Sequence, residues 1–139
     1  MLVSQSVAII ANVAQERTVK VLTEFSKGFP LVYLDRLRMK QALINLLVNA
    51  IEASPNGETV MVGCSQKRGE LIINVSDHGC VLSSAKREEI FLPFFTTKEK
   101  GTGLGLPIAK KIVEAHEGRL EFLKNPEGAG VTFRVIIPF

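Results

Sequence analysis

The sequence predicts an α+β domain, a two-layer α/β sandwich in which helices pack on a mixed, largely antiparallel sheet. The length of 139 residues suits one compact domain with a single core. Hydrophobic residues make up 46% of the chain and charged residues 22%, which excludes a disordered or fibrous protein. Segments of helical periodicity are grouped with alternating segments joined by short turns, and this grouping predicts helices on one face of a sheet.

The first half of the chain contains two helical segments. The first is predicted as one amphipathic helix over residues 1–14 by apolar residues at helical spacing, namely Val3, Val7, Ile10 and Ala14. Residues 18–25 alternate and predict a strand, and residues 31–34 predict a second, short strand. Asp35 is a suitable N-cap for a long helix from Arg36 to about Ala53, which residues 54–57 end.

The second half contains four strands and two helices. Strands at residues 59–65 and 70–76 are joined by a hairpin turn at residues 66–69. Ser83 or Ser84 caps a short helix through Ile90, and residues 91–103 form a loop rich in Thr, Lys and Gly. A helix follows at residues 104–117, with Gly118 expected at the left-handed position that ends it. Strands at residues 119–123 and 131–137 form a closing hairpin across residues 125–128.

Charge and cysteine content exclude several classes of function. Seventeen Lys and Arg against fourteen Asp and Glu give a net charge of +3, which is scattered and does not indicate nucleic-acid binding. No apolar run approaches the ~20 residues of a membrane helix, so we expect no membrane contact by this segment, and an anchor of the full-length protein would lie elsewhere. Cys64 and Cys80 are too few for a metal-ligand set or a disulfide framework, which is typical of a cytoplasmic protein.

A narrow polar stripe runs along the long helix. At about 100° per residue, apolar side chains cover most of its circumference, and the remaining side carries Gln41, Asn45, Asn49 and Glu52. A solvated stripe usually carries Lys, Arg and Glu, which form helices better than Asn. The two Asn residues, one turn apart, either offer oxygens to Mg²⁺ beside phosphate oxygens or bind nearby backbone in the core. The helix alone leaves both interpretations open.

Asp77 lies at the end of an apolar strand face. It points to the same side of the predicted strand as Leu71, Ile73 and Val75. A buried carboxylate is costly unless another group donates a hydrogen bond to it. The exocyclic amine of a purine would do so, and so would backbone N–H groups of the turn at Gly79, which is the commoner arrangement at the end of a strand.

The most informative segment is a glycine-rich run that precedes the last helix. Gly101, Gly103 and Gly105 let backbone N–H groups approach an anion, and the helix N-terminus adds partial positive charge. Lys98 and Lys100 add charge suited to a polyphosphate. The run matches neither the Walker A nor the Rossmann pattern. The rings before it predict a mobile lid with apolar anchors or, alternatively, a loop folded onto the core; they are Phe91, Phe94 and Phe95.

These segments resemble four sequence boxes of the sensor histidine kinases, in the order in which that family carries them. The N box resembles residues 41–50, QALINLLVNA, and the start of the G1 box resembles residues 77–79, DHG. The F box resembles residues 91–95, FLPFF, and the G2 box resembles residues 101–106, GTGLGL. The last strand of the family is similar to the closing GVTF and Pro138, so the resemblance spans essentially the whole chain.

The resemblance implies a catalytic ATP-binding domain of the GHKL superfamily, with three helices over about five strands. The segments FFTTK and NAIEAS resemble its nitrogen-regulation and sporulation kinases. In that family the N-box amides coordinate Mg²⁺, the G1 Asp accepts the adenine amine, and the G2 glycines hold the phosphates. The metal and catalytic roles fall here on Asn45 and Asn49. The nucleotide contacts fall on Asn49, Asp77, Gly79, Lys98, Gly101, Thr102, Gly103, Leu104 and Gly105.

Asn45 favours a histidine as the phosphoryl acceptor. Superfamily members that hydrolyse ATP or phosphorylate serine resemble this helix but carry Glu four residues before the second Asn, where it orients or deprotonates the attacking group. Asn45 accepts no proton at neutral pH, whereas a neutral imidazole already has a lone pair. We therefore expect the γ-phosphoryl group of Mg·ATP to pass to a histidine, with catalysis by positioning and charge stabilisation.

The acceptor histidine is expected outside these residues. His116 lies in the last turn of the predicted helix, where a cation suits the helix dipole, and His78 is not expected to be catalytic either. In the family the acceptor lies on a separate dimerisation domain upstream. Residues 1–139 are therefore expected to be the catalytic domain alone, without dimerisation or sensor domains. Its partners would be that phosphoacceptor domain, in the same chain or in trans, and a response regulator receiver domain.

Two positions depart from the family pattern. Val81 stands where the G1 box continues to a second Gly, so either the turn differs or the adenine pocket is partly filled. Glu52 stands where many members carry a basic phosphate ligand, which leaves that role to Lys98 and Lys100. The alternatives are therefore a degenerate module of the same fold with weak or no ATP binding, and a GHKL ATPase or serine kinase.

Overall fold

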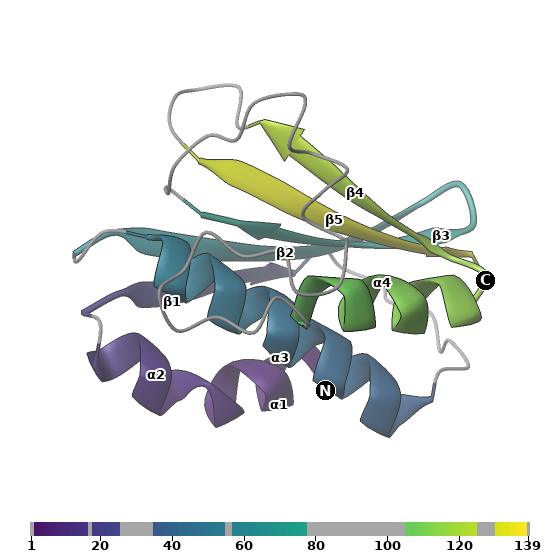
Figure 1. Cartoon of the computed structure of the whole chain (residues 1–139). Coiled ribbons are helices and arrows are strands. Elements are labelled where there is room, and N and C mark those ends of the chain that lie inside the picture. Colours follow the sequence, from purple (N-terminus) through teal and green to yellow (C-terminus); the bar gives the residue numbers. More distant parts are fainter. Residues whose placement is uncertain are drawn as a thin grey trace.

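The computed structural model of the chain describes residues 2–16, 18–25, 35–54, 57–77, 105–124 and 130–138. Within these ranges, helices cover one face of an open five-stranded sheet, as Figure 1 shows. This arrangement confirms the predicted two-layer α/β sandwich. The elements are α1 (Leu2–Ile9), α2 (Ala11–Glu16), β1 (Lys20–Phe25), α3 (Arg36–Ala53), β2 (Thr59–Lys67), β3 (Glu70–Ser76), α4 (Gly105–Ala115), β4 (Arg119–Lys124) and β5 (Val131–Pro138).

The sheet has the strand order β1-β2-β3-β5-β4. β1 pairs with β2 in parallel, and the other three pairs are antiparallel, so the sheet is mixed and largely antiparallel as predicted. The turn between β2 and β3 is shorter than expected, because the ladder continues until Lys67 pairs with Glu70. Arg68 and Gly69 both have positive φ, 51° and 77°, which is typical of the type I′ turn that suits twisted strands.

The core lies between the helices and one face of the sheet. On β3, buried residues alternate with half-buried ones, and Leu71, Ile73 and Val75 all face the core. α3 is buried along most of its length, through Met39, Ala42, Leu43, Leu46, Leu47, Ala50 and Ile51. Each fully buried leucine or isoleucine contributes roughly 1.5–3 kcal/mol relative to an exposed one, so this face of α3 stabilises the two layers strongly.

α3 begins and ends where the sequence predicts. The Asp35 carboxylate accepts a hydrogen bond from Arg38 N at 3.1 Å, which satisfies one of the free N–H groups of the first turn. At the other end, Ser54 Oγ donates to Ala50 O at 2.9 Å, and the Ser54 N–H donates to the same carbonyl. Both ends are thus satisfied by residues next to the helix in the chain.

The N-terminal helix differs from the prediction of one continuous helix. The structure divides it into α1 and α2 at Ile10, and the second helix ends at Glu16. The helical spacing survives the break, because Ile10 donates to Ser6 O and Ala14 donates to Ile10 O, at 3.3 and 3.1 Å. Ile10 and Ala14 therefore both reach the core, while Ile9 is 55% exposed.

Gly118 does not have the left-handed conformation predicted for it at the end of α4. The left-handed residue is Glu117, with φ of 62°, and the prediction of Gly118 at that position is wrong by one residue. The Gly118 N–H donates to Val113 O and the Glu117 N–H donates to Glu114 O, which together form a Schellman motif. Glycine is needed at 118 for space, because a Cβ there would lie 2.3 Å from Ile136 O.

Several predicted segments lie outside the described residues. They are the strand at residues 31–34, the short helix ending at residue 90, the loop at 91–103 and the turn at 125–128. Among the described helices, none combines the length and the apolar character needed to cross a membrane.

Candidate functional site

The C-terminal half of α3, the end of β3 and the start of α4 all point to one end of the sandwich. The chain passes from α3 to the start of β2 within residues 54–58, and Met61 near that start pairs with Ser76 at the end of β3. α4 leads into β4, whose first residue, Arg119, pairs with Ile136 near the opposite end of β5. α3 and α4 therefore run in opposite senses, and the start of α4 lies toward the end of β3 (Figure 1).

Asn45 and Asn49 lie on the C-terminal half of α3 and are both half-buried. One helical turn separates them, about 6 Å along the axis. Gln41, the first residue of the same stripe, is exposed, whereas Glu52 at its other end is half-buried. The stripe therefore becomes more buried toward the end of β3, and its two amide side chains are partly accessible to solvent.

Asp77 follows β3 directly and is only 1% exposed. It lies on the core side of the sheet after Val75, as the alternation predicts. Its Oδ1 accepts a hydrogen bond from Val131 N at 3.4 Å. The donor expected from the residues alone was the turn at Gly79, which lies outside the described residues. The first residue of β5 thus orients this carboxylate.

Gly105 is the first residue of α4, one position later than predicted. The first N–H groups of a helix have no carbonyl partner within it and carry partial positive charge, so they attract anions. Gly105 is the member of the glycine-rich run that the structure describes. The other predicted nucleotide contacts lie outside the described residues; they are Gly79, Lys98, Gly101, Thr102, Gly103 and Leu104. The same holds for Lys100 and for Val81.

His116 follows the end of α4 and bonds to both α4 and α3. Asp35 N donates a hydrogen bond to His116 Nε2 at 2.9 Å. Since Nε2 accepts, the ring proton lies on Nδ1, which donates to Ile112 O at 2.8 Å. The imidazole joins the C-terminal end of α4 to the N-cap of α3.

Neither the hydrogen bond from Val131 N nor the Asp35–His116 bond can be read from the sequence. No residue type signals Val131, because every residue except proline carries a backbone N–H. His116 could be singled out as one of two histidines, but its partner is a backbone group 81 positions away. The hydrogen-bond partners of Asp77 and His116 become apparent only once the strands and helices are packed together.

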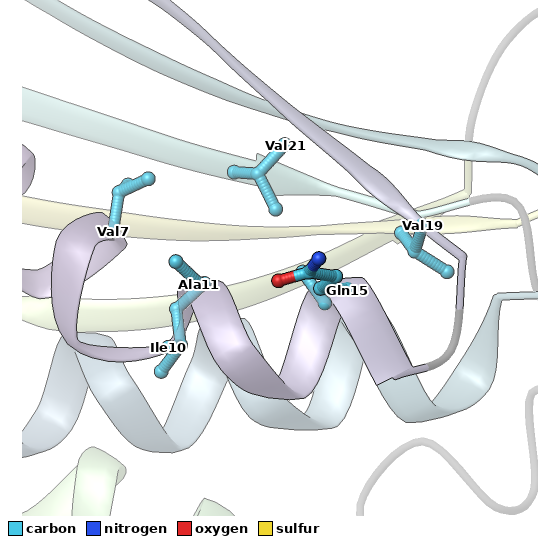
Figure 2. Close-up of a pocket in the computed structure, with 7 residues that line it drawn as sticks. Val7, Ile10, Ala11, Gln15, Val19 and Val21 are labelled. Carbon is cyan, nitrogen blue, oxygen red and sulfur yellow. The ribbon is translucent and has the colours of Figure 1, made fainter.

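A separate cavity lies between the N-terminal helices and β1, as Figure 2 shows. It encloses about 250 Å³ and is lined by Val7, Ile10, Ala11, Ala14, Gln15, Val19 and Val21. Six of these side chains are apolar and one is an amide, so the cavity offers no charge to an anion. None of the predicted site residues lines it. Within the described ranges, no cluster of three His, Cys, Asp or Glu could hold a metal ion.

Comparisons with known proteins agree with this fold. A family model described as "Histidine kinase-, DNA gyrase B-, and HSP90-like ATPase" matches residues 34–139. Sporulation kinase C of Bacillus subtilis (strain 168) is 35% identical over 131 residues, which are 94% of this chain and 29% of that protein. The chain thus spans less than a third of this curated relative.

Two solved structures are similar over nearly the whole chain. The nucleotide-free catalytic domain of histidine kinase ThkA is 34% identical, with a TM-score of 0.88, and the match covers 99% of this chain and 90% of that one. Histidine kinase ThkA in complex with the response regulator protein TrrA is 31% identical, with a TM-score of 0.84, over 99% of this chain and 39% of that one.

Proposed function

The chain belongs to the family of histidine kinase-, DNA gyrase B- and HSP90-like ATPases, and we propose that it binds Mg·ATP and donates the γ-phosphoryl group to a histidine on a separate domain. The observation that carries this proposal is the placement of three elements at one end of the sandwich. They are the amide stripe of α3, the buried carboxylate after β3 and the N-terminus of α4.

The chemistry of these groups fits a magnesium nucleotide. Amide oxygens such as those of Asn45 and Asn49 are hard ligands that suit Mg²⁺, which keeps several waters and phosphate oxygens around it. The N-terminus of α4 suits a phosphate group. A buried carboxylate such as Asp77 suits an amine donor and excludes an anion. When bound, Mg·ATP supplies the transferable phosphoryl group, and the metal ion neutralises charge on it.

The protein's own part in this reaction is positioning. Asp77 would accept a hydrogen bond from the exocyclic amine of the purine, while Val131 N holds the carboxylate in place. Asn45 and Asn49 would hold the metal ion through their amide oxygens, and the N–H groups at the start of α4 would orient the phosphates. The remaining proposed nucleotide contacts come from Gly79, Lys98, Gly101, Thr102, Gly103 and Leu104. Catalysis by such groups depends on alignment and charge stabilisation and needs no proton transfer by Asn45.

The proposed partners are a phosphoacceptor histidine domain and, after it, a response regulator. The ThkA–TrrA complex supports the second of these, because a kinase with a similar fold binds such a protein. We assign residues 1–139 to the catalytic domain, in the cytoplasm where ATP is available, and we expect no contact of this segment with nucleic acid or membrane.

Titration with a fluorescent ATP analogue, with and without Mg²⁺, tests the proposal. We expect saturable, Mg²⁺-dependent binding that unlabelled ATP reverses, without steady phosphate release. Absence of saturable binding at millimolar nucleotide would favour the degenerate module. Steady phosphate release without an acceptor, abolished by Asn45→Ala, would favour an ATPase or serine kinase instead.

A further inference from the structure

The His116 imidazole joins the two helices that carry the candidate site. One ring nitrogen is bonded within α4, to Ile112 O, and the other accepts from the backbone of Asp35. Asp35 is the N-cap of α3, and its carboxylate already binds Arg38 N. The junction therefore ties the last turn of α4 to the first turn of α3, at the end of the sandwich opposite to Asp77.

The junction sets the position of one helix along the other. α3 and α4 run in opposite senses (Figure 1). The end of α4 therefore lies beside the start of α3, and the start of α4 lies farther along α3. His116 and Gly105 are 11 positions apart, or about 16 Å at 1.5 Å per helical residue. The same number of positions along α3 from Asp35 reaches Leu46, next to Asn45. A bond at one end of the helix pair thus places the start of α4 level with the amide stripe at the other end.

The Asp35–His116 bond adds to the apolar packing between the two helices. α3 and α4 are in direct contact, and Ala109 and Val113 of α4 are fully buried in the core. This packing already resists a slide of one helix along the other, because protein interiors are close-packed. The Asp35–His116 bond adds a directional contact at one end of the pair, because a hydrogen bond weakens steeply when its angle falls below about 120°.

We propose that His116 is a positioning residue for the ATP site, which it reaches through the axial register of α4 against α3. This inference rests on the proposed function. His116 touches neither nucleotide nor metal in this role. It sets where the phosphate-binding start of α4 meets the metal-binding amides of Asn45 and Asn49, and a displacement of about 1 Å in such an arrangement can cost on the order of 10²-fold in rate.

Two substitutions separate the bond between the helices from the bond within α4. His116→Gln places an amide oxygen near the position of Nε2, so it retains an acceptor for the Asp35 N–H. His116→Asn places an amide N–H near the position of Nδ1, so it retains only the donor to Ile112 O. Asp35→Ala is the control for stability, because it removes the capping carboxylate but leaves the backbone N–H that His116 accepts.

The first measurement uses the nucleotide-free protein and follows the side-chain NH₂ signals of Asn45 and Asn49 by NMR. We expect His116→Asn to shift them, and His116→Gln and Asp35→Ala to leave them near their wild-type positions. The second measurement is the dissociation constant of Mg·ATP, which we expect to rise at least about tenfold in His116→Asn alone. Both are made well below the melting temperature of each variant.

Two results would overturn the inference. One is an equal effect of His116→Gln and His116→Asn on both readouts, which would indicate a role in stability only. The other is His116→Asn leaving the Asn45 and Asn49 signals unchanged. If the wild-type protein binds no nucleotide while His116→Asn still shifts those signals, the proposed function fails and the role of His116 in the helix register stands.

Discussion

Asp77 and Val131 are hydrogen-bonded to each other in both directions. Asp77 N donates to Val131 O at 2.9 Å, and Val131 N donates to Asp77 Oδ1 at 3.4 Å. They are the next residues in the antiparallel register beyond the Ser76–Thr132 pair of β3 and β5. The side-chain oxygen thus stands where the backbone carbonyl of Asp77 would continue the ladder. The ladder orients this carboxylate, and one of its oxygens is used in doing so.

Asp77→Asn should weaken ATP binding and leave the fold intact. The amide oxygen can still accept from Val131 N, but the charge that favours a purine amine is lost. A hydrogen bond to a charged group contributes about 1.5–3 kcal/mol, so we expect the dissociation constant to rise by roughly 10- to 100-fold. Calorimetry measures the affinity, and thermal melting without nucleotide should stay close to wild type. Unchanged affinity would remove Asp77 from the purine site.

Asn49→Ala should abolish Mg²⁺-dependent ATP binding, because it removes an oxygen proposed to ligate the metal. Gln41→Ala is the matched control, since Gln41 belongs to the same stripe but is exposed. We expect the control to bind as the wild type does in a calorimetric titration with Mg·ATP. Near-normal affinity of Asn49→Ala would contradict a metal-ligating role and would leave the amides as contacts within the fold.

Val81→Gly should tighten nucleotide binding, because Val81 stands where the G1 box of the family continues to a second glycine. A glycine can adopt positive φ without the steric cost that a branched side chain has in that conformation. The expected change is a severalfold lower dissociation constant for the fluorescent ATP analogue. An unchanged constant would mean that the valine does not intrude on the purine.

Gly118→Ala and Glu117→Gly should change stability in opposite directions. The new Cβ at 118 would lie 2.3 Å from Ile136 O, which forces backbone movement and should cost about 2–3 kcal/mol. Glu117 has φ of 62°, so glycine there relieves strain and should add roughly 0.5–1 kcal/mol. Denaturant unfolding measures both. A tolerated alanine at 118 would show that the β5 backbone at Ile136 can yield.

Cys64 should react slowly with alkylating reagents. Burial raises the pKa of its thiol from 9.0 to about 11, and only the thiolate is nucleophilic. In a Cys80→Ser background at pH 8, iodoacetamide should modify the native protein at least about 10²-fold more slowly than the unfolded protein. Equal rates would contradict the burial of this thiol.

The raised pKa of Cys64 also makes the free energy of unfolding depend on pH in the alkaline range. Because the folded state holds the proton more tightly than the unfolded state, this contribution is complete below pH 9. It is lost as the pH rises toward 11, by on the order of 2 kcal/mol. Cys64→Ala in the same background should remove the loss, which denaturant unfolding at pH 8 and pH 10.5 can measure.

Most of the fold could be predicted because its signals are local. The Asp35 cap, the alternation along β3 and the presence of a tight turn before Glu70 each depend on residues close together in the chain, although that turn takes two residues and not the four predicted. The break at Ile10 could not be predicted, since the apolar spacing continues through it. The role of Gly118 was misassigned because its neighbour at Ile136 belongs to another strand.

The candidate site could be predicted by residue type but not by partner. Asn45, Asn49 and Asp77 stand out because amides and acids are unusual on apolar elements. Their positions depend on groups that no local pattern indicates, such as Val131 N, which is 54 positions from Asp77. The same is true of the backbone group that His116 accepts.

The wide separation of Asp77 from Val131 has a kinetic consequence. The β2–β3 hairpin closes through two residues, whereas β3 meets β5 only after more than fifty intervening residues are brought together, at a higher entropic cost. We therefore expect the acid to be exposed to water until late in folding and to be released early when the sheet opens. A nucleotide bound to Asp77 would slow the opening of the sheet. The lifetime of the native sheet should therefore rise as the fraction of protein with bound nucleotide rises.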